Sequence, residues 1–323
     1  MKNKTVFITG GTGSWGHGLI LELLKEDVAK IIVYARNEYQ MVELSREFNN
    51  PKLEIVIGDI RDKNALLSAS KNVDILYHLS ALKHVPICEN MPYEAIETNI
   101  IGTKNVVDSA IENQIEKVIY VSTDKAVNPD CTYGSTKLLG EKLFLSANNI
   151  QSNTKFIVFR GGNLLGSAGS VIPLFERQIA EKGMVTLTDE RMSRFFISIQ
   201  DASKRLIKIS KRAVGGEIFI PYMPAIRIKD IAKYLLTKNK LDGNHISVTG
   251  IRPGEKLNEE LITETEKEHL YRFTNDLFLI SKKDMHGWLA NGIIEKSSDF
   301  AVRSDEAILS YENAAKFLNE AGV

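Results

Sequence analysis

Short apolar runs alternate with helical patterns through the first half of the chain. Six runs rich in β-branched and aromatic residues are typical of strands, and they cover residues 4–10, 30–36, 52–59, 74–81, 116–123 and 155–163. Between them, apolar residues recur at helical spacing, for example over 17–27 and 92–113. Strands that are apolar throughout are buried on both faces, and their alternation with helices indicates a parallel sheet. The pattern therefore predicts an α/β fold with a Rossmann-like, doubly wound parallel sheet.

The alternation becomes irregular after about residue 163. Short strands, helices and arginines mix in stretches such as TLTDERMSRFF, and RPGEKLNEELI is typical of a turn that leads into a helix. We expect residues 1–163 to form the main domain. We expect residues 164–323 to form mainly a smaller α/β substrate-binding lobe at the carboxyl ends of the strands, with some segments that return to the main domain. The tail after about Phe278 shows no informative pattern.

The composition narrows the classes of partner. The 41 Lys and Arg among the 323 residues balance 41 Asp and Glu, whereas nucleic-acid binding would need a basic excess. No apolar stretch reaches the roughly 18 residues that cross a bilayer, and the first strand follows without an apolar leader. Cys88 and Cys131 are too few for a disulfide framework, and the six histidines lack metal-ligand spacing. We therefore expect a cytoplasmic protein with no nucleic-acid, membrane or metal partner.

A glycine-rich loop joins the first predicted strand to the first helix. ITGGTGSWGHG contains Gly11-x-Gly13-x-x-Gly16, in which the first glycines permit a tight turn close to a pyrophosphate and Gly16 lets the helix pack on the sheet. The helix N-terminus presents unpaired N–H groups and the positive end of its dipole to phosphates. A turn without a ligand is the alternative, but the strand–loop–helix context favours a dinucleotide.

The end of the second predicted strand bears on the choice of cofactor. An acidic residue there would bind the adenosine 2′-hydroxyl of NAD, whereas this chain has Arg36 followed by Asn37. A guanidinium pairs with a 2′-phosphate, so NADP is favoured, and Glu38 leaves NAD possible. Asp59, after the third strand, is placed either to bind the adenine amine or to cap a turn. Residues 1–163 are therefore predicted to form an NADP-binding domain.

Tyr133 and Lys137 are one helical turn apart, so their side chains share a face. Tyrosine has an ordinary pKa of about 10, and a nearby ammonium and the nicotinamide charge would favour its phenolate. The phenolate could then take a proton from a sugar hydroxyl while hydride leaves the same carbon. Tyr133 and Lys137 come shortly after the fifth predicted strand, which ends in Thr123. This position favours a catalytic role over the alternative that both residues are simply exposed on a helix. Asp124 and Lys125, which lie in between, are not needed for alcohol oxidation alone.

Several segments resemble one family of enzymes. TGGTGSWG, STDKA, YGSTK and the general layout are similar to the extended short-chain dehydrogenase/reductase superfamily of nucleotide-sugar enzymes. Within it, EFNNPKLEIVIGDIRD, ALKHVPICE, TNIIGTKNVV, YGSTKLLGEKLFLSANN, GSVIPLF and GIRPGEKLNE resemble the inverting UDP-N-acetylglucosamine 4,6-dehydratases that start pseudaminic acid biosynthesis. The similarity covers roughly residues 4–265. It implies a lyase that uses tightly bound NADP transiently on a UDP-N-acetylhexosamine, for a cell-surface or flagellar glycan.

The resemblance implies a role at each matching position. Thr123 would bind the sugar O4, and Tyr133 and Lys137 would act in C4 oxidation. Asp124 and Lys125 would take the acid and base positions of an elimination, where retaining dTDP-glucose-type dehydratases have Asp-Glu. The implied cofactor contacts are Gly10, Thr12, Gly13, Ser14, Trp15, Gly16, Arg36, Asp59, Ile60, Ala81, Lys83, Thr98, Asn99, Tyr133, Lys137 and Leu164. The implied substrate contacts are Lys83, Asn163, Arg191, Arg252 and Glu255.

Elimination of water would give Asp124 and Lys125 a chemical role. Oxidation of C4 to a ketone acidifies the C5–H, so that a base can remove this proton while an acid protonates the departing C6 hydroxyl. Hydride then returns to C6, and a proton delivered to C5 from the opposite face inverts that centre. As the base, Lys125 must be deprotonated. We expect burial and the positive charge of Lys83 or of oxidised nicotinamide to lower the pKa of Lys125.

The chain departs from the family pattern at five positions. Asn37 and Gln40 stand where members often have Asp and Lys, and Ala35 replaces a hydroxyl residue. Gly161 takes the aromatic position of RYGN, and Ala168 replaces the Arg of GSRGS. These changes bear on the exact sugar, nucleotide base and product more than on the reaction type.

Other functions and features stay open. A retaining 4,6-dehydratase and a C4 epimerase of a nucleotide sugar share this scaffold, and a non-catalytic dinucleotide-binding protein is an alternative of another class. The arginines of ERMSRF and RPGEK could instead lie in solvated turns, and His84 is interpreted as a loop or packing residue. The apolar helix over Ile96–Ala110 predicts a homo-oligomer.

Overall fold

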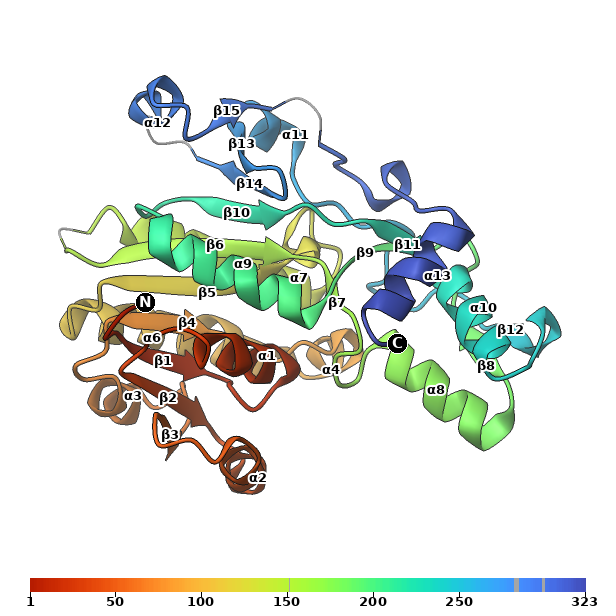
Figure 1. The fold of residues 1–323 in the computed structure, drawn as a ribbon, viewed down its shortest axis with the longest axis horizontal. Coiled ribbons are helices and arrows are strands. Elements are labelled where there is room, and N and C mark those ends of the chain that lie inside the picture. The colour runs from red at the N-terminus through yellow and green to blue at the C-terminus, as the bar shows by residue number, and fades with distance from the viewer. Residues whose placement is uncertain (151, 282–284, 298–299) are drawn as a thin grey trace.

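The six predicted strands are adjacent to one another and form one side of a large sheet (Figure 1). The computed structural model describes residues 1–150, 152–281, 285–297 and 300–323. The strands are β1 (Thr5–Thr9), β2 (Lys30–Ala35), β3 (Leu53–Ile57), β4 (Ile75–His78), β5 (Lys117–Thr123) and β6 (Lys155–Gly161). They pair in parallel in the order β3-β2-β1-β4-β5-β6. The prediction of a doubly wound α/β fold is confirmed.

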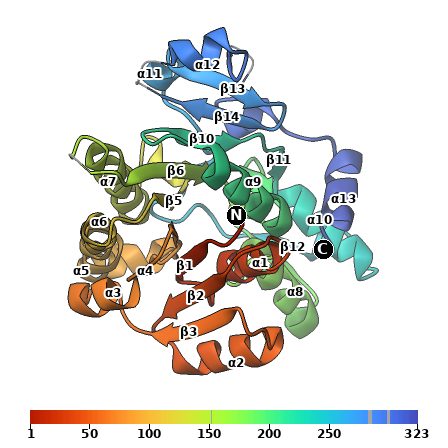
Figure 2. The ribbon, with the colours of Figure 1, turned by 60° about the vertical axis from the view of Figure 1, so that its left-hand side comes forward.

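Helices cover both faces of the sheet (Figure 2). One apolar core joins the sheet to α1 (Ser14–Leu23), α2 (Glu38–Phe48) and α9 (Ile199–Arg212). The other joins it to α3 (Lys63–Ala69), α6 (Gly102–Glu112) and α7 (Thr132–Ala147). Successive strand residues enter opposite cores, as Val6 and Ile8 do on one face and Phe7 on the other. Burial on both faces is the reason that these strands are apolar throughout.

The direction of winding changes between β1 and β4. From β1 the chain winds outward to β2 and β3, and from β4 it winds the other way to β5 and β6. In doubly wound sheets, ligands bind in the crevice outside the carboxyl ends of the strands at this point. The short helix α4 (Val85–Asn90) follows β4 there. The helical pattern over 92–113 corresponds to α5 (Pro92–Ile96), a π-helical turn (Glu97–Ile101) and α6.

Segments after residue 163 extend the same sheet. β10 (Ile218–Pro221) pairs in parallel with β6. β14 (Leu277–Ile280), β13 (Leu270–Thr274) and β15 (Glu295–Lys296) continue the sheet with antiparallel pairs. α9 also returns to pack beside α1, where Gly18 leaves room for Ile199. The second half of the chain therefore completes the main domain as well as forming a lobe.

The smaller lobe lies beyond the carboxyl ends of the main strands (Figure 1). It has one small sheet of β7 (Asn163–Leu164), β9 (Ser193–Ile197) and β11 (Ala225–Arg227), and another of β8 (Val185–Leu187) and β12 (Ile246–Val248). Its own apolar core joins α8 (Val171–Lys182), α10 (Ile228–Lys238) and α13 (Tyr311–Glu320), so the uninterpreted tail supplies a packed helix. The remaining short helices are η2 (Asp124–Ala126), η3 (Gly243–His245), α11 (Glu264–Lys267), α12 (His286–Ala290) and η4 (Ser304–Glu306).

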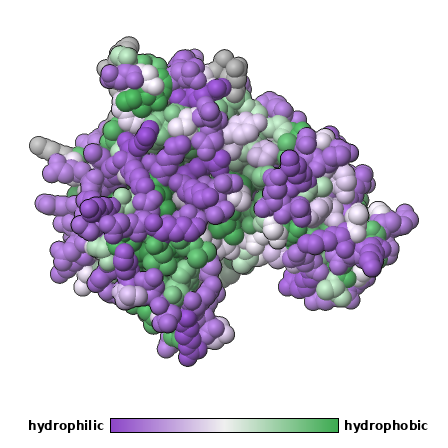
Figure 3. Space-filling view, viewed as in Figure 1, coloured by the Kyte–Doolittle hydropathy of each residue, from purple (hydrophilic) through white to green (hydrophobic). Residues whose placement is uncertain are grey.

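Polar residues cover most of the face seen in Figure 3, around smaller apolar areas. Among the described residues, no helix has both the length and the apolar character that crossing a membrane requires. Cys88 and Cys131 are buried free thiols.

Candidate functional site

The glycine loop has the geometry that close approach of a phosphate requires. Gly10 has a positive φ of 69°, and a methyl group added there would lie 2.8 Å from the backbone nitrogen of Ser80. A methyl group at Gly16 would lie 2.2 Å from the carbonyl oxygen of Gly11, so only glycine permits this helix–strand packing. Gly13 caps α1 without a side-chain hydrogen bond, which leaves the first N–H groups of the helix available to a ligand.

A cavity of about 460 Å³ opens beside this loop. It contains eleven of the residues predicted to bind cofactor: Gly10, Thr12, Gly13, Ser14, Trp15, Arg36, Asp59, Ile60, Ala81, Lys83 and Thr98. Asn99 lies behind the cavity wall, where its amide binds the backbone of Leu82 and the hydroxyl of Thr136. Asn99 is therefore placed to shape the wall through Leu82.

The cavity residues fit a dinucleotide. Thr98 lines the cavity, and its hydroxyl is buried with no hydrogen-bond partner among the described residues. Ser122 lines a second, neighbouring cavity, and its hydroxyl is likewise buried with no hydrogen-bond partner among the described residues. Buried polar groups that lack a protein partner indicate that a bound molecule supplies one. Together with the open N-terminus of α1, these groups are suited to a phosphate-containing ligand.

Arg36 and Asp59 meet at the outer end of this cavity. The Asp59 carboxylate accepts hydrogen bonds of 2.9 and 2.7 Å from the Arg61 guanidinium, and Arg36 lies 3.5 Å away. Burial opposes ionisation of Asp59, but the bonds from Arg61 outweigh it and lower the pKa of the carboxyl. The Arg36 side chain is 52% exposed, so its guanidinium is accessible to an anionic ligand. The side chain of Asn37 caps α2 by accepting a hydrogen bond from the backbone N–H of Gln40.

A second cavity of about 250 Å³ adjoins the first. Trp15 and Lys83 line both cavities, and Lys83 is the residue predicted to contact both cofactor and substrate. The Lys83 ammonium donates to the carbonyl of Ala168, and burial lowers its pKa. Predicted residues from four separate segments also line this second cavity: Thr123, Lys125, Tyr133, Lys137, Asn163 and Leu164.

Tyr133 and Lys137 lie at the start of α7. The Cys131 sulfur caps this helix by accepting from the backbone of Gly134. Lys137 donates a 2.6 Å hydrogen bond to the carbonyl of Val121. Burial lowers the pKa of Lys137 to about 7. Burial also raises the pKa of Tyr133, and the nearby Lys125 ammonium opposes this shift.

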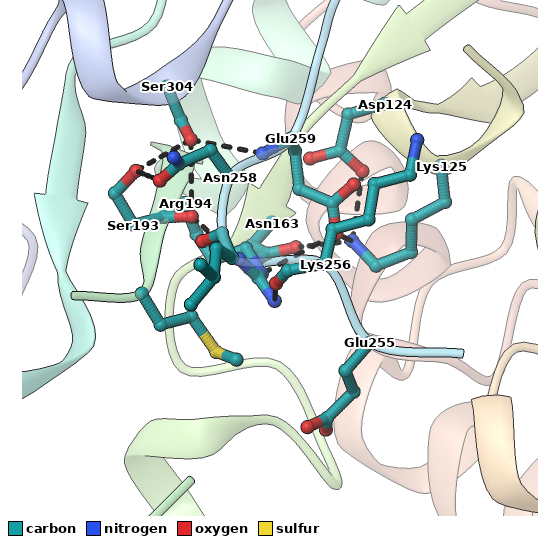
Figure 4. Close-up of polar contacts among 12 residues, drawn as sticks. Asp124, Lys125, Asn163, Ser193, Arg194, Glu255, Lys256, Asn258, Glu259 and Ser304 are labelled. Atoms are coloured by element: carbon teal, nitrogen blue, oxygen red, sulfur yellow. Dashed lines mark hydrogen bonds and ion pairs between the residues drawn. The ribbon is translucent and has the colours of Figure 1, made fainter. Parts of the chain in front are cut away.

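Lys125 lies between two buried carboxylates (Figure 4). Its ammonium is 2.9 Å from Asp124 Oδ1 and 3.2 Å from Glu259 Oε1, and it also faces Asn163 Oδ1 at 3.4 Å. Asp124 also accepts a 2.9 Å hydrogen bond from the hydroxyl of Thr123. Both carboxylates are almost wholly shielded from solvent, at 0% and 2% exposure. The site therefore contains a buried acid–amine–acid cluster.

The prediction of a lowered pKa for Lys125 is wrong for this arrangement. Burial by itself would lower it, but the charges of Asp124 and Glu259 outweigh burial and raise the pKa of the ammonium. Burial raises the pKa of the Asp124 carboxyl, although Lys125 favours the ionised form. The surroundings therefore favour the protonated form of both groups.

The residues predicted to bind the nucleotide end of the substrate lie outside the two cavities. Arg191 is 73% exposed and binds Asp189 through its guanidinium at 3.0 and 2.8 Å. Arg252 is half exposed and lies 3.8 Å from Glu255, which points away from Lys125 in Figure 4. None of Arg191, Arg252 and Glu255 lines either of the two cavities.

Two buried residues of the cluster were not identified from the sequence. Arg194, three residues after Arg191, donates to the carbonyls of Lys256 and Leu257 and lies 3.5 Å from Glu259. Glu259 lies four residues beyond Glu255 in the same RPGEKLNEE segment, which forms turns and bends rather than the helix that the sequence predicted there. The only sequence signal for either was its proximity to a predicted substrate residue, and burial at the site could not be read from spacing.

A family model described as polysaccharide biosynthesis protein matches residues 6–281. This chain belongs to that family. A UDP-N-acetylglucosamine 4,6-dehydratase (inverting) of Campylobacter jejuni subsp. jejuni serotype O:2 is 43% identical over 307 residues, which are 93% of this chain and 87% of the relative. An uncharacterized membrane protein of Methanocaldococcus jannaschii is 44% identical over 315 residues, covering 95% and 94% of the two chains.

This member of the polysaccharide biosynthesis protein family also has a close structural relative. The X-ray structure of Pen from Bacillus thuringiensis matches it with a TM-score of 0.91 and 37% sequence identity, over 99% of both chains. The predicted family resemblance is therefore confirmed over nearly the whole chain, and the main domain and the lobe together have a counterpart in one solved structure.

Proposed function

We propose that this protein is a UDP-N-acetylglucosamine 4,6-dehydratase that inverts C5 and yields a UDP-4-keto-6-deoxy-L-hexosamine. The observation that carries the proposal is a cavity lined by Lys125, Tyr133 and Lys137, next to a cavity suited to a dinucleotide. Asp124 does not line it, but its buried carboxylate binds the Lys125 ammonium at 2.9 Å. A redox enzyme without an elimination step has no evident use for a buried acid–amine pair. The dehydratase name of the 43% identical relative supports the same reaction.

Tyr133 and Thr123 are assigned to the C4 oxygen. Their hydroxyls line the cavity at the end of β5 and the start of α7, where Thr123 orients the sugar and Tyr133 takes its proton. The nearby Lys137 favours the phenolate of Tyr133 whenever it carries a charge. Held by these cavity residues, a dinucleotide would supply the hydride acceptor at C4 and the hydride donor at C6, and a proton from solvent would reach C5 from the opposite face.

Asp124 and Lys125 are assigned to the elimination. Transfer of one proton across their 2.9 Å hydrogen bond converts carboxylate and ammonium into carboxylic acid and free amine. The amine of Lys125 then takes the C5 proton, and the acid of Asp124 gives its proton to the C6 hydroxyl, which leaves as water. The pair returns to ammonium and carboxylate, so no external base is consumed. The exchange supplies an acceptor for the proton that Lys125 must lose, although the raised pKa of Lys125 opposes this transfer.

NADP is the proposed cofactor. Arg36 directly follows β2, where an NAD-binding protein would carry an acid, and this half-exposed residue lines the cavity. Calorimetric Kd values for NADP and NAD test the choice. Arg36→Ala is expected to weaken NADP binding and to leave NAD binding nearly unchanged, whereas equal losses for both would argue for NAD.

The remaining assignments concern substrate and assembly. Asn163 is proposed to bind the sugar diphosphate, and Arg191, Arg252 and Glu255 the nucleotide end, as the substrate extends outward from the cavity. A homo-oligomer is supported by exposed apolar side chains on α4, α5, the π-helical turn and α7, namely Ile87, Tyr93, Ile96, Ile101 and Leu139. Light scattering of the purified protein tests this proposal. A cytoplasmic location is proposed because its substrate class and free thiols suit that compartment.

Incubation with NADP and UDP-N-acetylglucosamine in D₂O tests the reaction. The proposal expects a product that has lost one water by mass and carries deuterium at C5 with inverted configuration by NMR. Deuterium with retained configuration would indicate a retaining dehydratase, and a 4-epimer with its original C5–H would indicate an epimerase. Tight NADP binding without turnover of any UDP-, GDP- or dTDP-hexose would support a non-catalytic protein.

A further inference from the structure

Glu259 brings a carboxylate from the second half of the chain to the elimination pair. Asp124 and Lys125 lie directly after β5, whereas Glu259 lies in the segment between β12 and α11. Its Oε1 faces Lys125 at 3.2 Å and Arg194 at 3.5 Å. A residue 134 positions away in sequence thus shares the ammonium with Asp124.

A purely structural role does not account for this arrangement. Arg194 already donates to the carbonyls of Ser193, Lys256 and Leu257, so its guanidinium has partners without Glu259. The Oε2 atom of Glu259 is buried and has no hydrogen-bond partner in the described part of the chain. Burial of a carboxylate with one unsatisfied oxygen is costly, and a fold that needed only packing would be served better by an apolar residue.

We propose that Glu259 is a positioning residue for Lys125, whose ammonium it binds together with Asp124 so that the amine is aimed at the reacting carbon during elimination. This inference rests on the proposed function. Asp124 and Glu259 bind the same nitrogen from different segments, which restricts a long, flexible side chain to one place. The geometry of the base therefore depends on the lobe segment that also carries Arg252 and Glu255.

The charged groups around Lys125 and Glu259 determine how a substitution of Glu259 changes the pKa of Lys125. Lys125 is faced by Asp124, Glu259, Arg194 and Tyr133, and Glu259 is faced by Lys125, Arg194 and Lys256. Glu259→Gln keeps the size of the side chain and removes one negative charge. The pKa of Lys125 must then fall, because one of the two carboxylates that raise it is lost. The amine becomes easier to form but less well placed.

The test separates oxidation from elimination in the full-length protein with NADP and UDP-N-acetylglucosamine. Single-turnover absorbance of reduced cofactor reports C4 oxidation, and water loss by mass reports elimination. For Glu259→Gln we expect oxidation close to the wild-type rate, elimination slower by roughly ten- to a hundredfold, and accumulation of reduced cofactor. We also expect the acid limb of the elimination pH profile to move down by roughly one unit or more. Glu260→Gln removes the adjacent carboxylate, which binds Asn128 instead, and should match the wild type in both steps.

The outcomes distinguish the inference from the function on which it rests. Wild-type elimination and an unmoved pH profile in Glu259→Gln would overturn the inference and leave the dehydratase intact. Equal loss of both steps with a lowered Tm would assign Glu259 to folding alone, also overturning it. If Glu259→Gln does not fold, Glu259→Asp, which keeps the charge but retracts it, should still oxidise faster than it eliminates. A wild-type protein that neither reduces cofactor nor releases water would contradict the proposed function and this inference together.

Discussion

Arg160 on β6 and Glu141 on α7 are joined by two hydrogen bonds, of 3.0 Å from Nε and 2.7 Å from Nη2. Both side chains are buried, and Glu266 binds the same guanidinium from α11 at 2.9 and 3.0 Å. The network fixes α7, and with it Tyr133 and Lys137, against the sheet.

Arg160→Met should therefore destabilise the protein strongly. Removal of the guanidinium leaves the carboxylates of Glu141 and Glu266 without their cation, which in buried pairs costs about 3–5 kcal/mol of unfolding free energy. Urea denaturation followed by circular dichroism measures the loss. Arg303→Met, which breaks an exposed pair with Asp305, should cost a small fraction of that. Equal stability of the two variants would contradict the assignment.

Lys125→Ala is expected to abolish formation of the 4-keto-6-deoxy product, because Lys125 both binds Asp124 and lines the cavity. NADP binding should persist, since Lys125 does not line the cofactor cavity. Mass spectrometry of the product and calorimetry of cofactor binding are the two measurements. Full turnover by the variant would rule Lys125 out as the base.

Gly16→Ala should weaken NADP binding by about tenfold or more. Its methyl group would lie 2.2 Å from the carbonyl of Gly11, so the loop must move away from the phosphate position. Gly243→Ala, in open space on the lobe, is the matched control and should bind like the wild type. Calorimetry gives both Kd values, and unchanged affinity in Gly16→Ala would show that the loop does not bind the cofactor.

Lys137 makes the stability of the unliganded protein depend on pH. Its folded pKa of about 7 lies below its ordinary value of 10.5, so between these values the unfolded chain binds more protons than the folded one. The contribution of Lys137 to stability therefore rises with pH through this window, by at most about 1.4 kcal/mol per pH unit. Lys137→Met removes the titrating group, so this variant lacks the pH-dependent contribution to stability.

Urea denaturation of both proteins at pH 7, 8 and 9 checks the prediction. The stability of the wild type relative to Lys137→Met should increase with pH. A constant difference across this range would show that Lys137 stays charged in the fold.

The main domain could be predicted well because its signals are local. Each strand carries its own apolar run, and the glycine loop and the Tyr133–Lys137 spacing are each contained in one short segment. These features predicted the strands and the fold class, and many of the residues predicted to bind a ligand line the two cavities. Asn99 is a partial exception, since its neighbour Thr98 lines the cavity while Asn99 holds its wall from behind.

The charge state of the cluster could not be predicted, because it depends on contacts between distant segments. Sequence alone determined that Asp124 and Lys125 are neighbours and lie close to Tyr133. Only the tertiary structure brought Glu259 and Arg194 to them and left Arg191 and Arg252 exposed. Since Coulomb interactions in a buried site depend on distance and on exclusion of water, this packing reversed the direction of the Lys125 pKa shift.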